Sequence, residues 1–214
     1  MIYLFAKAKF KGVVSIELSQ ISFKKIRANL NKYEALIISS KNALKALKKS
    51  EKELNLEQKI YAIGQNSAKK ALKMGFKNVK FCKKANARDF FKEFKEELRR
   101  LKSLYLRAKK IAFDMSKALR AEGASSKSLI CYEALYKEPR KDLSLKRPCV
   151  LIFTSPLSVS FFLKSFEFKK EDKLVAIGQS TAKALKAVCK NEIYTPKKAS
   201  IKECVRLARS LATP

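Results

Sequence analysis

The sequence predicts an α/β fold of two similar lobes, each built on a parallel sheet. The first observation is an internal repeat, in which residues 62–69 (AIGQNSAK) return as residues 176–183 (AIGQSTAK). Flanking blocks return in the same order and at nearly the same spacing, 36–40 as 151–155 and 83–86 as 197–200. The second observation is that short apolar runs alternate with amphipathic stretches, which is typical of parallel α/β sheets. We therefore interpret the chain as an internal duplication.

The first half of the chain predicts strands that alternate with helices. Apolar runs predict strands at 2–5, 13–18, 35–38, 59–63, 79–82, 104–106 and 128–136. Apolar residues at helical spacing predict helices after Ser39-Ser40, after Gly64, over 90–101 and over 116–121, where Gly123 follows as a C-terminal cap. A shorter helix that carries Phe23, Ile26 and Leu30 is predicted to end near residue 31.

The second half predicts strands at 149–153, 173–177 and 192–194, with helices after Ser155, after Gly178 and over 200–211. This copy stops one strand short of the first. The beginning of the chain completes it, because residues 2–5 resemble 104–107 and residues 13–18 resemble the long strand through Tyr132. We therefore expect a discontinuous lobe (1–12 and 140–214), an inserted lobe (20–127), a two-stranded β linker (13–19 and 128–139), and a cleft between the lobes.

Composition excludes several kinds of chemistry. The chain has no histidine, which rules out a Ser-His-Asp triad, a Cys-His dyad and HExxH zinc sites. Its five cysteines form no CxxC pair and fit reduced core thiols. No apolar run reaches the roughly 18–20 residues that a membrane span needs. We expect a soluble cytoplasmic protein.

The formal net charge of +30 raises the question of nucleic-acid binding. The lysines are scattered over almost every polar face, and no RNP-like, helix-turn-helix or zinc-finger pattern lies among them. A solvated lysine-rich surface explains the charge better than a nucleic-acid groove does. A third interpretation is that the overall field attracts a polyanionic small substrate.

Candidate binding residues follow four repeat-related strands. In parallel α/β sheets, ligands bind beyond the carboxyl ends of the strands, where helix N-termini offer N–H groups to anions. Hydroxyl groups and glycines stand at these turns: Ser39, Ser40, Gly64, Ser67, Thr154, Ser155, Gly178, Ser180 and Thr181. Capping of a helix explains any one hydroxyl, whereas four such turns at one cleft favour an anion site. The spacing is neither a Walker loop nor a dinucleotide fingerprint.

Four motifs occur in a fixed order along the chain: Ile-x-x-Ser-x-x-Ala at 37–43, a tyrosine and a following proline at Tyr132 and Pro139, Ile-Phe-Thr-Ser-Pro at 152–156, and Ala-Ile-Gly-x-x-Thr-Ala at 176–182. With them the chain resembles the uroporphyrinogen-III synthase family over nearly its full length. The resemblance implies two flavodoxin-like lobes joined by a two-stranded linker. In two places the chain departs from the family: its N-terminal segment lacks the usual first helix, and Arg107-Ala108 stands where many members have Arg-Gly.

The resemblance also implies an activity, the closure of hydroxymethylbilane to uroporphyrinogen III with inversion of the last pyrrole and loss of water, without cofactor or metal. The substrate carries eight carboxylates, which anion-binding turns and lysines can hold. Departure of its hydroxyl requires a proton donor. Tyr132 matches the family's linker tyrosine, and a phenol with an ordinary pKa of roughly 10 stays protonated at neutral pH. The alternative for Tyr132 is an aromatic ring that only packs on its strand.

Two other functions stay open at this point. The first is a non-catalytic two-lobed module that binds small anions, although a signal peptide and a helix-turn-helix, which periplasmic receptors and sugar repressors carry, are not found in the sequence. The second is nucleic-acid binding, which rests on charge alone. For the enzyme we expect a monomer that associates with no membrane.

Overall fold

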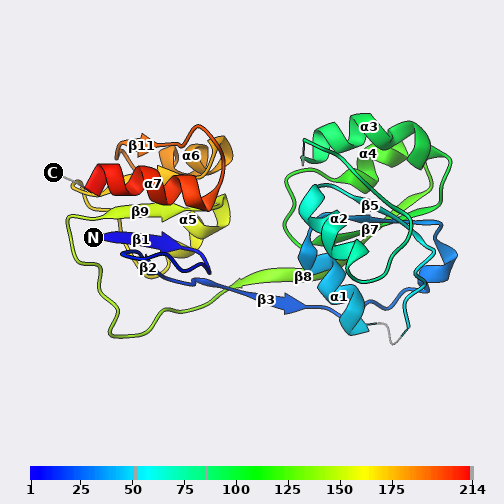
Figure 1. The fold of residues 1–214 in the computed structure, drawn as a ribbon, viewed down its shortest axis with the longest axis horizontal. Coiled ribbons are helices and arrows are strands. Elements are labelled where there is room, and N and C mark those ends of the chain that lie inside the picture. Colours follow the sequence, from blue (N-terminus) through cyan, green and yellow to red (C-terminus); the bar gives the residue numbers. More distant parts are fainter. Residues whose placement is uncertain (51–52, 85, 213–214) are drawn as a thin grey trace. The chain divides into compact units, whose positions relative to one another are not determined.

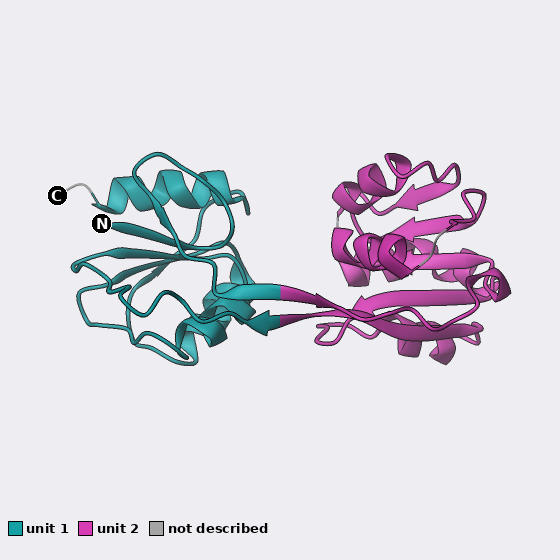
Figure 2. Cartoon of the chain, turned by 90° about the horizontal axis from the view of Figure 1, so that it is seen from below, with its two compact units in different colours: residues 1–20, 135–214 teal, residues 21–134 magenta. Residues whose placement is uncertain are grey.

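The structure, a computed structural model, describes residues 1–50, 53–84 and 86–212 (Figure 1). The chain divides into two compact units (Figure 2). The central unit is Ile21–Ala134, and the terminal unit combines Met1–Gln20 with Leu135–Pro214. The chain passes from one unit to the other twice, in β3 (Ser19–Phe23) and in β8 (Ser126–Tyr136).

Among the described residues, the sheet of the central unit has six strands in the order β3-β8-β7-β4-β5-β6, and the pairs from β8 to β6 are parallel. The remaining bounds are β4 Ala35–Ile38, β5 Lys59–Ala62, β6 Val79–Phe81 and β7 Ser103–Ala108. Helices α1 (Lys41–Ser50) and α2 (Gln65–Leu72) cover one face of the sheet. Helices α3 (Ala87–Arg99) and α4 (Met115–Ala121) cover the other.

The apolar runs in the sequence become strands that are buried on both faces. In β4, Leu36 packs with Leu44 of α1, whereas its neighbour Ile37 packs on the opposite face with Phe90 of α3. Successive side chains of a strand point to opposite faces, so a strand between two helical layers must be apolar throughout. Gly123 ends α4 as predicted, with a φ of +82° that glycine adopts without a steric penalty.

The terminal unit has a sheet in the order β11-β10-β9-β1-β2, in which every pair is parallel. Its strands are β1 Ile2–Phe5, β2 Val14–Ser15, β9 Val150–Phe153, β10 Lys173–Ala176 and β11 Ile193–Tyr194. Helices α5 (Pro156–Phe162) and α6 (Gln179–Lys186) cover one face. Helix α7 (Ile201–Ala212) covers the other.

The two sheets repeat one pattern. Strands β9, β10 and β11 match β4, β5 and β6 in order, and β1 pairs with β9 as β7 pairs with β4. The prediction that the beginning of the chain completes the second sheet is therefore confirmed. The segment between β1 and β2 carries no helix, whereas α4 stands between β7 and β8. Ala6, Phe10 and Val13 of this segment pack on the same face of the sheet as α7.

The prediction of a linker strand at 13–19 is wrong in its position. Val14 and Ser15 pair with β1 inside the terminal unit, and the strand that crosses between the units starts later, at Ser19. The N–H of Lys24 donates to the carbonyl of Cys131 at 2.9 Å, and the N–H of Lys137 donates to the carbonyl of Leu18 at 3.0 Å. These two bonds set β3 and β8 in opposite directions, with β8 starting before the predicted residue 128.

The helix predicted through Phe23, Ile26 and Leu30 is also wrong. Phe23 is the last residue of β3, and only the short 3-10 helix η1 (Leu30–Lys32) follows, capped by the side chain of Asn29. Three apolar residues at helical spacing here mark contacts with the core instead. None of the helices within residues 1–50, 53–84 and 86–212 has the length and hydropathy of a membrane span.

Candidate functional site

A hydrogen bond between two side chains marks the carboxyl edge of the central sheet. The Tyr132 hydroxyl of β8 lies 2.6 Å from Oγ of Ser40, which stands between β4 and α1. Ser40 Oγ also accepts the N–H of Asn42 at 3.2 Å, in the first turn of α1. Next to it, Ser39 Oγ donates to the carbonyl of Leu106 at 3.4 Å. The structure therefore brings Ser39, Ser40 and Tyr132 together, from segments far apart in the sequence.

A β-bulge aims Tyr132 at this edge. Arg107 of β7 stands opposite Ile130, but Ala108 stands opposite Tyr132, so one extra residue is inserted in β8 at Cys131. Regular pleating would send Cys131 and Tyr132 to opposite faces, yet both pack in the core beneath α1 and α2. Tyr132 is 8% exposed and leaves little more than an edge accessible.

Sequence reasoning overlooked Tyr105 as a member of this group and saw Arg107 only as part of a departure from the family motif. Burial raises the pKa of the Tyr105 phenol, and a hydrogen bond with Ser39 opposes the shift. Arg107 Nη1 donates to the carbonyls of Ala108 and Lys109 at 3.0 and 3.2 Å, and its Nε is buried without a partner among the described residues. An arginine at the end of the otherwise apolar strand SLYLRA was the available signal.

The other turn of the central unit has a different character. Gly64 is the N-cap of α2 and provides no side chain to cap it, so the N–H groups of Gln65 and Asn66 at this helix start have no side-chain cap. Ser67 is buried, and its N–H donates to the carbonyl of Gly64 at 3.0 Å. The Ser67 side chain is therefore largely inaccessible, and Gly64 supplies the more open part of this turn.

In the terminal unit, Thr154 and Ser155 line a hollow of about 170 Å³ beyond β1 and β9. Lys7, Glu17 and Ser19 line the same hollow. Ser155 is the N-cap of α5 and forms a capping box with Ser158, with N···Oγ distances of 3.1 and 3.2 Å, and Pro156 follows at the first helical position as predicted. The Ser155 side chain is engaged in this cap, whereas Thr154 lines the hollow together with the charged Lys7 and Glu17.

The last predicted turn surrounds Gly178, the N-cap of α6. Thr181 is only 1% exposed, and its N–H donates to the carbonyl of Gly178 at 3.0 Å. Ser180 is exposed. Gly178 and Ser180 are thus the accessible members of this turn, and Thr181 packs beneath it.

The chain is thus an α/β protein of two units, and each unit has polar turns at the ends of its strands. In the central unit, a tyrosine and a serine are joined by a hydrogen bond between their side chains. No cluster of metal-ligating side chains occurs among the residues that the structure describes.

The comparisons with known proteins name the family. The family model described as uroporphyrinogen-III synthase HemD matches residues 4–206, and the chain belongs to this family. The crystal structure of uroporphyrinogen-III synthetase from Helicobacter pylori 26695 is similar at 26% identity, covering 98% of each chain, with a TM-score of 0.85. A mutant uroporphyrinogen III synthase from the extremely thermophilic bacterium Thermus thermophilus shares the fold at 12% identity, over 100% of this chain and 99% of that one, with a TM-score of 0.58. No curated protein matches.

Membership of this family establishes the reaction. The chain is an enzyme of tetrapyrrole biosynthesis that cyclises hydroxymethylbilane to uroporphyrinogen III. The family and its fold therefore agree with the activity that the sequence motifs implied, and the non-catalytic and nucleic-acid alternatives are no longer needed.

Proposed function

We propose that Tyr132 is the proton donor of this cyclisation and that the strand-end turns bind carboxylates of hydroxymethylbilane. The observation that carries the proposal is the 2.6 Å hydrogen bond between the Tyr132 hydroxyl and Ser40. Ser40 Oγ also accepts the N–H of Asn42, and in the proposed arrangement the Ser40 hydroxyl donates its own proton to the Tyr132 oxygen. The phenol can then direct its proton away from Ser40, towards a substrate.

In the proposed reaction, Tyr132 protonates the hydroxyl of the hydroxymethyl group as the carbon–oxygen bond breaks and water leaves. The cationic azafulvene that remains is attacked by the substituted carbon of the terminal ring, which gives a spiro intermediate. Rearrangement and loss of a ring proton complete the macrocycle, and that proton restores the phenol. The Ser40 hydroxyl and the N-terminus of α1 would stabilise the transient phenolate.

The binding groups we propose come from the strand-end turns in each unit, namely Ser39, Ser40, Gly64, Thr154, Ser155, Gly178 and Ser180, and Ser67 and Thr181 of the same turns support them. Their burial divides them into groups that can contact substrate and groups that support the turns. The uncapped N–H groups after Gly64 and Gly178, together with the exposed Ser180, are suited to carboxylates. Buried Ser67 and Thr181 hold the helix starts in position. Lys7 beside Thr154 supplies a positive charge.

Tyr132→Phe tests the proposed acid, because it keeps the ring and removes the proton. Turnover should fall by roughly 10²–10⁴-fold, the range of general acid catalysis. Losing the bond to Ser40 should lower the free energy of unfolding by only about 0.5–1.5 kcal/mol. Single-turnover kinetics and urea unfolding measure the two effects.

Tyr136→Phe is the matched control, since Tyr136 lies on the same strand and its hydroxyl contacts the Ser165 hydroxyl. It should keep full turnover. Near-full turnover in Tyr132→Phe would show that the phenol is not the acid and that a water molecule or a substrate carboxyl takes its place.

We also propose that the enzyme works as a monomer in the cytoplasm. The five cysteines, all among the described residues, are present as thiols, which supports a reducing compartment. The excess of positive charge disfavours self-association, which supports a monomer. Light scattering should give a mass near 24.3 kDa, and a dimer mass would contradict this proposal.

A further inference from the structure

Helices α1 and α2 pack side by side over one face of the central sheet and carry charge of a single sign (Figure 1). Neither helix contains an acidic residue. Their charged residues are all lysines: Lys41, Lys45, Lys48, Lys49, Lys69 and Lys70. Among the described residues, none of these lysines forms an ion pair. Within the described part of the chain, no ion pair therefore offsets the repulsion among these lysines.

The opposite face of the same sheet does not carry charge of a single sign. Helix α3 mixes both signs and forms ion pairs, with Lys80 to Glu97 at 2.6 Å and Arg99 to Glu96 at 3.1 Å. The fold does not require the lysines either. Helix α5, the counterpart of α1 in the repeat, reads PLSVSFF and has no charged residue.

Between α1 and α2 the surface is hollowed. A groove of about 340 Å³ is lined by Leu44, Lys45, Lys48, Lys49, Lys70 and Met74. The half-buried Met74 supplies the accessible apolar floor, since Leu44 is fully buried, and the four lysines form the rim. Lys49 is held in place, with Nζ 4.5 Å from the centre of the Phe23 ring. We call this feature the lysine groove.

We propose that the lysine groove binds an acidic segment of a partner protein. An aliphatic side chain of the segment would sit on the apolar floor, and carboxylates on either side would pair with the lysine rim. The groove lacks the features of a nucleic-acid site, since its lining contains no arginine for bidentate phosphate contacts and no aromatic ring for base stacking. A flat lipid surface would reach the rim and leave the floor empty. Acidic protein therefore fits both parts of the groove.

The test measures binding of a labelled peptide to the full chain by fluorescence anisotropy. The peptide carries four glutamates around one leucine, and a second peptide replaces that leucine by serine. The Lys45→Glu/Lys70→Glu variant should weaken binding of the leucine peptide at least 10-fold. The control variant, Lys183→Glu/Lys186→Glu, makes the same change of net charge on α6 and should weaken it less than 2-fold. The serine peptide should bind the unmodified chain several-fold more weakly.

Three outcomes would overturn the proposal. An equal loss in both double variants would show attraction by net charge alone. Equal binding of the leucine and serine peptides would show that the floor is not used. Stronger binding of double-stranded DNA or phosphatidylserine vesicles, abolished by Lys45→Glu/Lys70→Glu, would assign the groove to another class of partner. The kcat of cyclisation should be unchanged in all variants, which separates this result from the catalytic proposal.

Discussion

Thr181 and Ser180 are adjacent hydroxyl residues that the structure treats differently. Thr181 is buried beneath the start of α6, whereas Ser180 is exposed. Thr181→Ala should therefore lower the free energy of unfolding by about 1–3 kcal/mol, the usual cost of trimming a buried side chain, and leave KM unchanged. Ser180→Ala should raise KM and leave stability unchanged. Denaturant unfolding and steady-state kinetics on both variants measure these effects. The reverse pattern would show that Thr181 contacts the substrate and that Ser180 does not.

The buried thiols make the free energy of unfolding depend on pH in the alkaline range. Burial raises the pKa of the Cys131 thiol to about 12, and that of Cys204 to about 11. In the unfolded chain these thiols ionise at their ordinary pKa, near roughly 8.5. The stability they contribute is complete below that value and is lost as pH rises towards the folded pKa values. Urea unfolding should show falling stability from about pH 9 upwards, and a smaller fall in Cys131→Ala. An identical slope in the variant would contradict the assignment.

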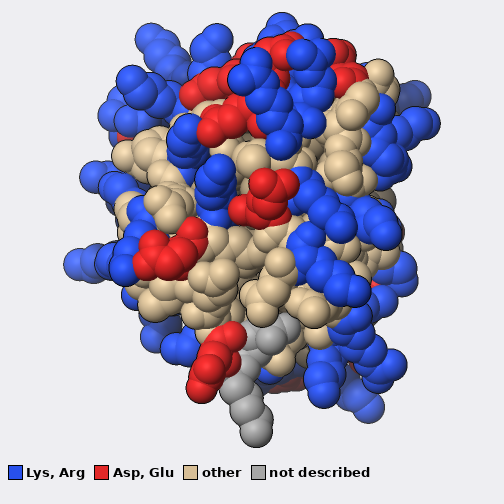
Figure 3. All heavy atoms as spheres, turned by 90° about the vertical axis from the view of Figure 1, so that its right-hand side faces the viewer, with Lys and Arg blue, Asp and Glu red and all other residues tan. Residues whose placement is uncertain are grey.

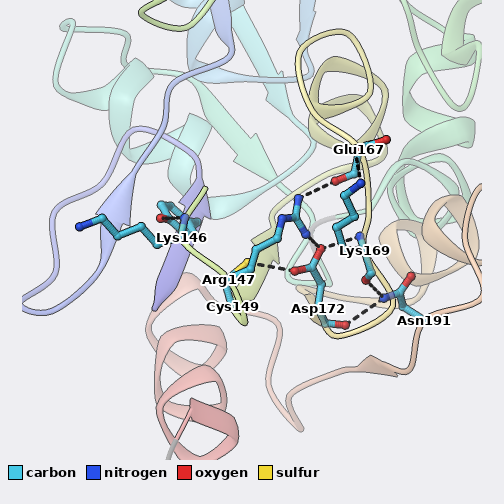
Figure 4. Close-up of polar contacts among 8 residues, drawn as sticks. Lys146, Arg147, Cys149, Glu167, Lys169, Asp172 and Asn191 are labelled. Carbon is cyan, nitrogen blue, oxygen red and sulfur yellow. Dashed lines mark hydrogen bonds and ion pairs between the residues drawn. The ribbon is translucent and has the colours of Figure 1, made fainter. Parts of the chain in front are cut away.

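At the scale of elements, a buried ion pair fixes the loops at the amino edge of the terminal sheet (Figure 4). The Asp172 side chain is fully buried and accepts from Arg147 Nη1, from the N–H of Lys169 at 2.8 Å and from the Cys149 thiol at 3.1 Å. Asn191 donates to the carbonyls of Lys169 and Asp172. The segments that precede β9, β10 and β11 are thereby joined, at the edge opposite the strand-end turns.

Asp172→Ala should lower the free energy of unfolding by about 3–5 kcal/mol, because it leaves the Arg147 guanidinium largely buried without its partner. The double variant Asp172→Leu/Arg147→Met removes both charges and should lose less. Turnover per folded molecule should be unchanged in both, since this network lies away from the proposed site. Chemical denaturation measures the difference, and equal losses in the single and double variants would contradict a buried ion pair.

An element could be predicted from the sequence where its own local pattern of residues determines its structure. Strands such as β4 and β9 are apolar on both faces, and their turns carry caps such as Ser155-Pro156 that act within a few residues. The segment 13–31 has weaker patterns, and its pairing depends on distant partners, β1 for Val14 and β8 for Phe23. Those contacts override the local preference that predicted one strand and one helix there.

The site was predictable in part for the same reason. The internal repeat marked Ser39 and Ser40, and the family resemblance marked Tyr132, but the bulge at Cys131 that brings Tyr132 to Ser40 has no local signature. The burial of Ser67 and Thr181 also depends on the helices above them and not on the turn sequence.

At the scale of the whole molecule, the dominant physical property is charge. In Figure 3, lysine and arginine side chains surround the face and also reach into its middle, with acidic side chains and uncharged surface between them. With a net charge of +30, the field should attract a substrate with eight carboxylates. Raising the ionic strength from 0.01 to 0.15 M shortens the Debye length from roughly 30 to 8 Å and should raise KM, with little effect on kcat. Steady-state kinetics at constant pH test this, and a KM independent of salt would exclude steering by the field.

The isomer composition of the product shows whether this chain inverts the terminal ring of hydroxymethylbilane. Unguided hydroxymethylbilane closes to the symmetric type I isomer, so only an enzyme that inverts the terminal ring gives type III. Hydroxymethylbilane is mixed with excess enzyme, without added metal or nucleotide, and the product is oxidised and separated by chromatography. The type III isomer should dominate. Type I as the main product at enzyme excess would show that the chain does not invert the terminal ring.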